Sequence, residues 1–220
     1  MFYLAIDQEI QIRTLHPDHA EAFFQLVERN RSRLRPWIHP NALPETVSSA
    51  RKLTIESFLN SLPDPMDGQE ESHRYLQELD QYIPPLNPPM EMGIWVNEQL
   101  AGQIMLGRLQ ENFTQAEIGY WIDSASEGRG IVTRCVSGLM DYAIDNMGIE
   151  RFLIGCASEN HRSSAIPKRL GYRLLATVPD GELVGDFIYD RSIYEMQSSA
   201  WREQGRTRMQ NSTFVDTQSC

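Results

Sequence analysis

The sequence predicts an α/β (α+β) protein with a mixed central sheet that carries helices on both faces. Segments with strand-like alternation and segments with helical spacing follow one another along the chain, which excludes an all-α or all-β protein. The chain has 220 residues, of which 41% are hydrophobic and 23% charged. A chain of this length and composition can bury a substantial core without disulfides or a structural metal.

The first half of the chain reads as one strand, two helices and an insertion. Residues 10–15 alternate apolar and polar side chains, which predicts a strand. Apolar residues at helical spacing predict helices over about 18–30 and 48–59. Residues 62–89 are rich in proline around a short helical candidate at 70–82. We interpret this stretch as an insertion, either a lid over a cleft or a plain surface loop.

The second half adds six strands, which makes about seven in all. Turn residues separate the two strands of a predicted hairpin. Further along, the sequence predicts a long amphipathic helix and a short helix that ends at Gly171, with apolar strand-like stretches before and after them. The predicted strands are 92–96, 100–109, 115–122, 151–157, 172–178 and 187–196, and the helices are 130–147 and 163–170. Residues 1–200 are expected to form a single domain, followed by a polar, disordered tail at 201–220.

Composition and charge exclude several classes of function. The formal net charge of −10 argues against nucleic acid as a partner and is compatible with a cationic amine. The sequence shows neither a signal peptide nor an apolar run of membrane-spanning length, so we expect a cytoplasmic protein with no membrane partner. The cysteines Cys135, Cys156 and Cys220 have no metal-binding spacing and the histidines are scattered, so no metal is predicted.

The strongest local motif joins a strand to a helix through a glycine-containing loop. Residues 117–133 read Glu-Ile-Gly-Tyr-Trp-Ile-Asp-Ser-Ala-Ser-Glu-Gly-Arg-Gly-Ile-Val-Thr. Gly128 and Gly130 allow a pyrophosphate to approach free backbone amides at the helix start, and Arg129 adds positive charge there. The spacing matches neither a dinucleotide-binding fingerprint nor a P-loop. An ordinary strand–turn–helix corner is the alternative reading.

A second motif changes the interpretation of the first. Residues 160–172 read Asn-His-Arg-Ser-Ser-Ala-Ile-Pro-Lys-Arg-Leu-Gly-Tyr, and Asn160 is placed to cap a helix. Together the two motifs resemble the GNAT N-acetyltransferase superfamily, in particular the RimL-like branch, which acetylates N-termini of ribosomal proteins. The resemblance extends over residues 10–196 and includes segments 33–37 and 185–194. The loop departs from the family pattern, because Glu127 and Val132 stand at its first and last positions.

The resemblance implies a largely antiparallel GNAT-type sheet and acetyl-CoA as the acetyl donor. The coenzyme-binding residues that it implies are Trp121, Ile122, Gly128, Arg129, Gly130, Ile131, Val132, Thr133 and Asn160. It implies Glu182 as the general base and Ser163 as the residue near the coenzyme sulfur. Glu117 is the alternative base, since it precedes the strand that would contact the coenzyme. Surface carboxylates and an ordinary serine at a helix N-terminus remain the competing readings.

Three hypotheses about function follow from the resemblance. The first is direct acetyl transfer to a primary amine at a protein or peptide N-terminus. The second keeps this chemistry with a small amine, such as a polyamine, an amino sugar or an antibiotic. The third is a catalytically inactive protein that binds acyl-CoA or takes part in assembly. The sequence leaves the oligomeric state open, with a homodimer as one candidate.

Overall fold

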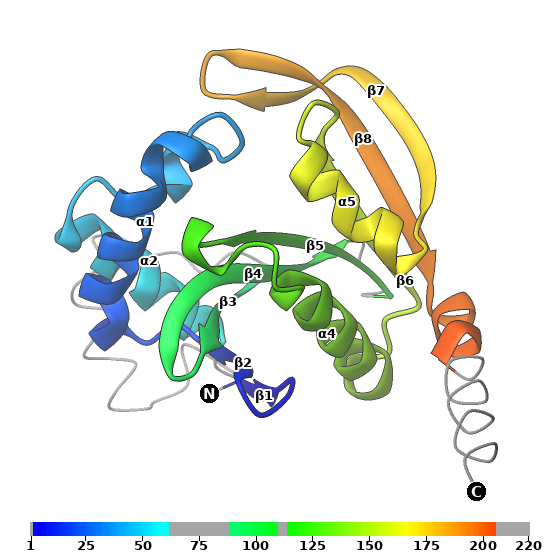
Figure 1. Cartoon of the computed structure of the whole chain (residues 1–220), viewed down its shortest axis with the longest axis horizontal. Coiled ribbons are helices and arrows are strands. Elements are labelled where there is room, and N and C mark those ends of the chain that lie inside the picture. Colours follow the sequence, from blue (N-terminus) through cyan, green and yellow to red (C-terminus); the bar gives the residue numbers. More distant parts are fainter. Residues whose placement is uncertain (1, 62–88, 110–113, 206–220) are drawn as a thin grey trace, which may run out of the picture.

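The computed structural model describes residues 2–61, 89–109 and 114–205. The strands in these ranges form a single eight-stranded sheet in the order β1-β2-β3-β4-β5-β6-β8-β7 (Figure 1). Among the described pairs only β5 and β6 run parallel, so the predicted mixed, largely antiparallel sheet is confirmed. The strands are β1 Tyr3–Ala5, β2 Ile10–Thr14, β3 Met90–Val96, β4 Gln99–Leu109, β5 Gln115–Ile122, β6 Arg151–Ala157, β7 Arg173–Val184 and β8 Phe187–Gln197.

The sequence predicts about seven strands, and the described residues form eight; the additional strand is β1. This strand has only three residues and pairs with β2 through a tight turn. The Asp7 carboxylate stabilises that turn by accepting hydrogen bonds from the amides of Glu9 and Ile10, each at 2.9 Å. Three residues are too few to show an alternating pattern, so the strand leaves no clear signal in the sequence.

The helices follow the predicted positions with small changes at their ends. They are α1 Ala20–Leu34, α2 Val47–Asn60, α4 Ile131–Met147 and α5 His161–Leu170, with short 3-10 segments at Pro17–His19, Pro40–Ala42 and Ser124–Ser126. Thr46 caps α2, where its hydroxyl accepts a hydrogen bond from the amide of Ser49 at 3.1 Å. Helix α1 continues one turn beyond its predicted end, and this turn buries Leu34.

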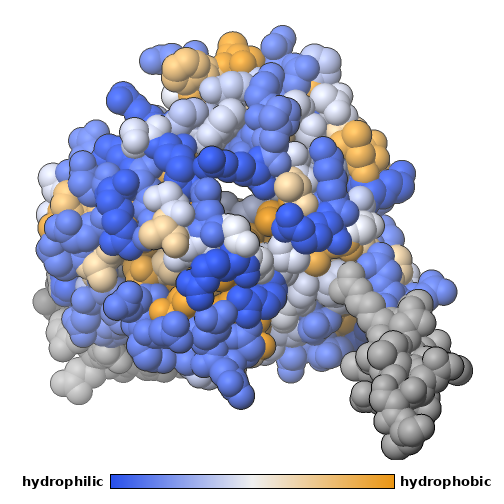
Figure 2. All heavy atoms as spheres, in the orientation of Figure 1, coloured by the Kyte–Doolittle hydropathy of each residue, from blue (hydrophilic) through white to orange (hydrophobic). Residues whose placement is uncertain are grey.

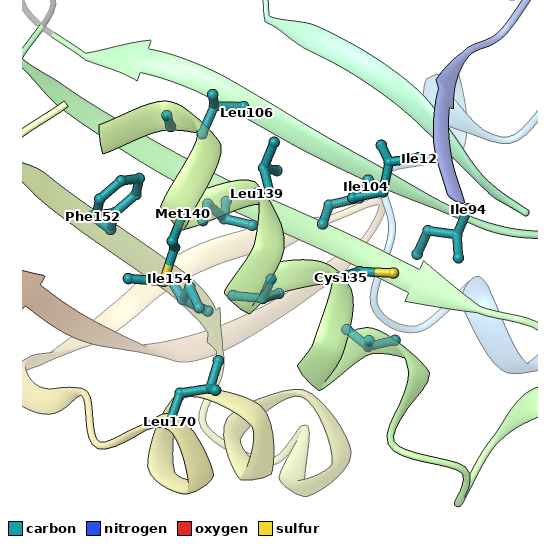
Figure 3. Close-up of a cluster of buried hydrophobic side chains, with 14 of the residues drawn as sticks. Ile12, Ile94, Ile104, Leu106, Cys135, Leu139, Met140, Phe152, Ile154 and Leu170 are labelled. Carbon is teal, nitrogen blue, oxygen red and sulfur yellow. The ribbon is translucent and has the colours of Figure 1, made fainter. Parts of the chain in front are cut away.

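Helices cover both faces of the sheet, as predicted. Ile94 and Trp95 are neighbours in β3, so their side chains point to opposite faces. Ile94 packs in the core beneath α4, whose Cys135, Leu139 and Met140 are fully buried (Figure 3). Trp95 lies in the other core, which α1 and α2 cover with residues that include Phe23, Leu26, Val27 and Ala50. The sheet is therefore the common wall of two apolar layers.

The hairpin of β7 and β8 arches over one end of the molecule (Figure 1). β7 is longer than predicted, so Glu182 lies within this strand rather than after it. The pairing shifts between Val178, opposite Arg191, and Glu182, opposite Tyr189. Three residues of β7, 179–181, thus face a single residue of β8, and Asp180 adopts a positive φ of 51°. This bulge returns Glu182 to the inner side of the hairpin.

The predicted polar tail, 201–220, begins too early. Residues 198–205 are helical, and Trp201 is buried against the core, where its Nε1 donates to Asp141 Oδ1 at 2.6 Å. The single aromatic side chain explains the difference, because it anchors an otherwise polar segment. Residues 206–220 lie outside the described residues, as does the predicted insertion at 62–89 apart from Pro89. Within the described ranges, no helix is both long and apolar enough to cross a membrane.

Candidate active site

A cavity of about 1150 Å³ opens where β5 and β6 separate. Figure 2 shows a hollow near the centre of the molecule, bordered by both hydrophilic and hydrophobic side chains. The two parallel strands pair only from Gln115 to Glu117, opposite Arg151 to Leu153. The rest of β5, which ends in Trp121 and Ile122, therefore runs along the cavity without a partner strand on the β6 side. This splayed geometry leaves the edge of β5 open toward the cavity.

The glycine loop forms one wall of the cavity. Gly128 and Gly130 have φ angles of 75° and 69°, which only glycine adopts without strain. Gly130 caps α4 without a side chain. Apart from the adjacent residues, no atom of the described part of the chain lies within 4 Å of the position that a Cβ would take at either glycine. The amides of the first helical turn, Ile131 to Thr133, therefore face the cavity with room for a bound anion. All six residues from Gly128 to Thr133 line it.

Glu127 does not leave an uncompensated negative charge beside this loop. Its carboxylate accepts from Arg33 Nη1 at 2.7 Å and lies 3.2 Å from Arg162 Nη1. Arg33 belongs to α1 and Arg162 to α5, so this Arg33–Glu127–Arg162 bridge links two helices on either side of the loop. Arg129 instead pairs with Glu9 at 2.9 Å. Two arginines thus balance the negative charge of Glu127, the residue at which the loop departs from the family pattern.

Asn160 and Ser163 begin helix α5 beside the cavity. The Asn160 side chain accepts from the Ser163 amide at 3.1 Å, so the predicted helix cap is confirmed. The Tyr120 hydroxyl donates to the Ser163 carbonyl at 3.0 Å, which ties α5 to β5. Cys156 lies against Ser163; burial raises the pKa of its thiol, and the hydrogen bond with Ser163 opposes this shift. All four side chains line the cavity.

The two predicted base candidates lie together, joined by an arginine that sequence reasoning missed. Arg191 of β8 contacts Glu117 with its Nη2, 2.5 Å from Oε1, and Glu182 with its Nε, 3.5 Å from Oε2. Burial raises the pKa of the Glu182 carboxyl, the Arg191 charge opposes this shift, and the Glu117 charge adds to it. Glu182 lines the cavity, so a carboxyl group with a raised pKa faces the space where an acceptor would enter.

A third carboxylate, Glu91, lies on the opposite side of the cavity. Gln103 connects it to β5, because its amide donates to Glu91 at 3.1 Å and accepts from Trp121 Nε1 at 3.0 Å. Burial and the charge of Glu56 raise the pKa of Glu91, and the bond from Gln103 opposes this. Neither Glu91 nor Gln103 stood in a recognisable motif. Within the described ranges, no three metal-binding side chains come together.

The comparisons with known proteins identify the family. The sequence model of the acetyltransferase (GNAT) domain matches residues 9–173, so the chain belongs to the GNAT acetyltransferase family. The predicted family, fold and N-acetyltransferase activity are thereby confirmed. Acetyl-CoA is the acetyl donor of this family, and the open glycine loop and uncapped helix start fit its diphosphate. The residues that would hold it are those of the loop and the free part of β5.

Named relatives support the RimL-like branch. A Bacillus subtilis (strain 168) protein named "putative ribosomal N-acetyltransferase YdaF" is 28% identical over 201 residues, which cover 91% of this chain and 98% of the relative. The ribosomal-protein-serine acetyltransferase of Escherichia coli (strain K12) is 29% identical over 101 residues, 46% of this chain and 56% of that protein.

Solved structures share the fold. The crystal structure of a probable acetyltransferase has a TM-score of 0.73 and 28% identity, and the alignment covers 91% of this chain and 99% of the other. RimL, a ribosomal L7/L12 α-N-protein acetyltransferase solved with coenzyme A, also has a TM-score of 0.73. Its identity is 20%, with 90% of this chain and 99% of RimL covered.

Proposed function

We propose that this acetyltransferase modifies the α-amine at the N-terminus of a protein, with a ribosomal protein as the first candidate. The relative that is similar over almost its whole length carries a ribosomal N-acetyltransferase name, and so does the shorter E. coli match. The observation that carries the proposal is the cavity itself. It runs from the uncapped start of α4 to the carboxylates of Glu182 and Glu91.

The geometry supports the following roles. An α-amine arrives largely as an ammonium, which has no free electron pair, so a carboxylate must remove a proton before the amine can attack. Glu182 is the proposed base, since it lines the cavity. Glu117, which shares Arg191 with Glu182, is the alternative. Bound acetyl-CoA supplies the thioester. Ser163 at the start of α5 is the proposed hydrogen-bond donor for the coenzyme sulfur.

The coenzyme would lie along the splayed edge of β5 and over the glycine loop. The free edge of β5 offers backbone groups to an extended chain, as an added strand would use them. The loop offers amides and the positive end of the α4 dipole to the diphosphate. The proposed contacts are those predicted from the sequence: Trp121, Ile122, Gly128, Arg129, Gly130, Ile131, Val132, Thr133 and Asn160.

An acceptor survey tests this proposal. The full chain is incubated with acetyl-CoA and either short peptides with free N-terminal serine or alanine, spermidine, or an amino sugar, and acetylated products are measured by mass spectrometry. We expect kcat/KM to be highest for a peptide, with no product when its N-terminus is blocked. Faster acetylation of spermidine or the amino sugar would instead establish the small-amine alternative. A cytoplasmic location fits a ribosomal acceptor and, like a homodimer, stays a prediction.

A further inference from the structure

We propose that Arg191 is a positioning residue, which binds Glu117 tightly and so leaves Glu182 as the carboxylate that takes the proton from the acceptor. This inference rests on the proposed function and assigns the base within it. The contacts of Arg191 with the two carboxylates are unequal: 2.5 Å to Glu117 and 3.5 Å to Glu182. The guanidinium of an arginine binds one carboxylate best in a close, aligned pair.

The longer contact with Arg191 leaves the Glu182 carboxylate able to accept a proton. Glu182 Oε2 and Arg191 Nε are both buried, and neither atom has a hydrogen-bond partner among the described residues. They face each other at 3.5 Å, beyond a good hydrogen bond. An oxygen in this state can accept a proton without first breaking a strong bond. The transfer breaks one N–H bond and forms one O–H bond, and the nitrogen keeps the electron pair for its attack.

The backbone of β6 makes room for this arrangement. A methyl group at Gly155 would lie 2.5 Å from Arg191 Nη2 and 2.6 Å from its Nε. Only a residue without a Cβ allows the guanidinium to lie flat against the strand at this point. Gly155 is opposite Ile193 in the β6–β8 pairing, so the strand that carries Arg191 also fixes its distance from β6.

Among the described residues, the ion pairs of Arg191 are those with Glu117 and Glu182. Cys156 of β6 lies next to the cluster: burial and the Glu182 charge raise the pKa of its thiol, and the charges of Lys168 and Arg191 oppose this shift. Glu117 comes from β5 and Glu182 from β7. The cluster of two carboxylates and one guanidinium thus carries a net negative charge, and Glu182 is the member of it that lines the cavity where a cationic amine would enter.

Arg191→Gln tests the proposal through the titration of Glu182. The full chain with coenzyme A bound is followed by 13C NMR of its glutamate carboxyl carbons, and Glu182→Gln assigns the Glu182 signal. We expect Arg191→Gln to raise the pKa of Glu182 by about one unit or more, since an opposite charge at this distance has effects of ~1–3 units. The acidic limb of kcat/KM with an N-terminal-serine peptide should move to higher pH by the same amount.

Further variants separate positioning from loss of structure. Gly155→Ala keeps the charges of Arg191 and Glu182 but displaces the guanidinium. It should therefore raise the pKa of Glu182 as well, by less than Arg191→Gln does. Arg191→Lys should lie between wild type and Arg191→Gln. Arg202→Gln is the matched control, since this arginine pairs with Asp145 on the exposed surface. It should leave both measurements unchanged.

The proposal is overturned if Glu182 titrates alike in wild type and in folded Arg191→Gln and Gly155→Ala chains. It is also overturned if these variants lower only the plateau of kcat/KM without moving its acidic limb, since that is the effect of a structural arginine. The NMR titration needs no acceptor. A wild-type chain that acetylates no peptide would therefore refute the proposed function while the assignment of Arg191 is still decided.

Discussion

Glu182 is the residue on which the proposed chemistry most depends, because its carboxylate is the proposed base. We expect Glu182→Gln to lower kcat by about 100-fold or more, the usual effect of losing a general base. Coenzyme A affinity, measured by calorimetry, should remain near the wild-type value because the glutamine keeps the shape of the side chain. Glu117→Gln is the paired variant and should have the smaller effect. Wild-type turnover in Glu182→Gln would be incompatible with its role.

The raised pKa of Glu182 also fixes the direction of the pH dependence. The base works only when deprotonated, and burial raises its pKa despite the opposing charge of Arg191. Activity should therefore fall as the pH is lowered through a value above that of an ordinary glutamate. This acidic limb of kcat/KM should disappear in Glu182→Gln, which has no carboxyl group to titrate.

Two glycines at the ends of α4 offer a matched test of the coenzyme loop. Gly130 and Gly148 have nearly equal φ angles, 69° and 66°, and a Cβ at either position would have no non-adjacent atom of the described residues within 4 Å. Gly130→Asp should weaken coenzyme A binding at least ~10-fold, because it adds a negative charge where the diphosphate would bind. Gly148→Asp imposes a similar backbone strain at the far end of the helix and should leave affinity unchanged. Equal losses in both would contradict the loop assignment.

At the scale of the elements, the Arg33–Glu127–Arg162 bridge links α1 and α5 beside the coenzyme loop. Glu127→Gln removes a negative charge and releases two arginines next to a site for a polyanion. We expect calorimetry to show up to about fivefold tighter binding of coenzyme A, since partly exposed charges contribute ~0.2–1 kcal/mol. The gain should diminish at high salt. Asp145→Asn, which removes a charge far from the cavity, is the control; weaker binding in Glu127→Gln would mean that Glu127 is needed to orient the arginines.

Elements with local signals were predictable from the sequence, and contacts between distant residues were not. The glycine loop and the Asn160 cap lie within a few residues of the helices that they begin, so their spacing alone indicated them. The ion pair of Arg191 and Glu117 joins residues 74 positions apart. No local pattern records that β8 lies next to β6 or that Gly155 leaves space for a guanidinium. The resemblance supplied Glu182, while its partner required the three-dimensional arrangement.

At the scale of the whole molecule, ligand binding should stabilise the fold. A ligand that binds only the folded chain adds ~2.7 kcal/mol at 100 times its Kd. For a chain of this size, we expect acetyl-CoA at that concentration to raise the Tm by roughly 5–10 °C. Differential scanning fluorimetry measures the shift, and Gly130→Asp should reduce it. An unchanged Tm at saturating acetyl-CoA would contradict the proposed binding of the coenzyme at the glycine loop.

The bulge in β7 has a consequence for how this enzyme tolerates change in length. Neighbouring side chains of a strand point to alternate faces. Whether the number of extra residues in the bulge is odd or even therefore affects which side chains point to the inner face. Three residues opposite one keep Glu182 on the inner face. Removing or adding one residue there would turn the carboxylate outward unless a one-residue bulge, like the one between Leu174 and Ala176, absorbs the change. Length variation in this stretch should therefore be acceptable only where Glu182 still pairs with Tyr189.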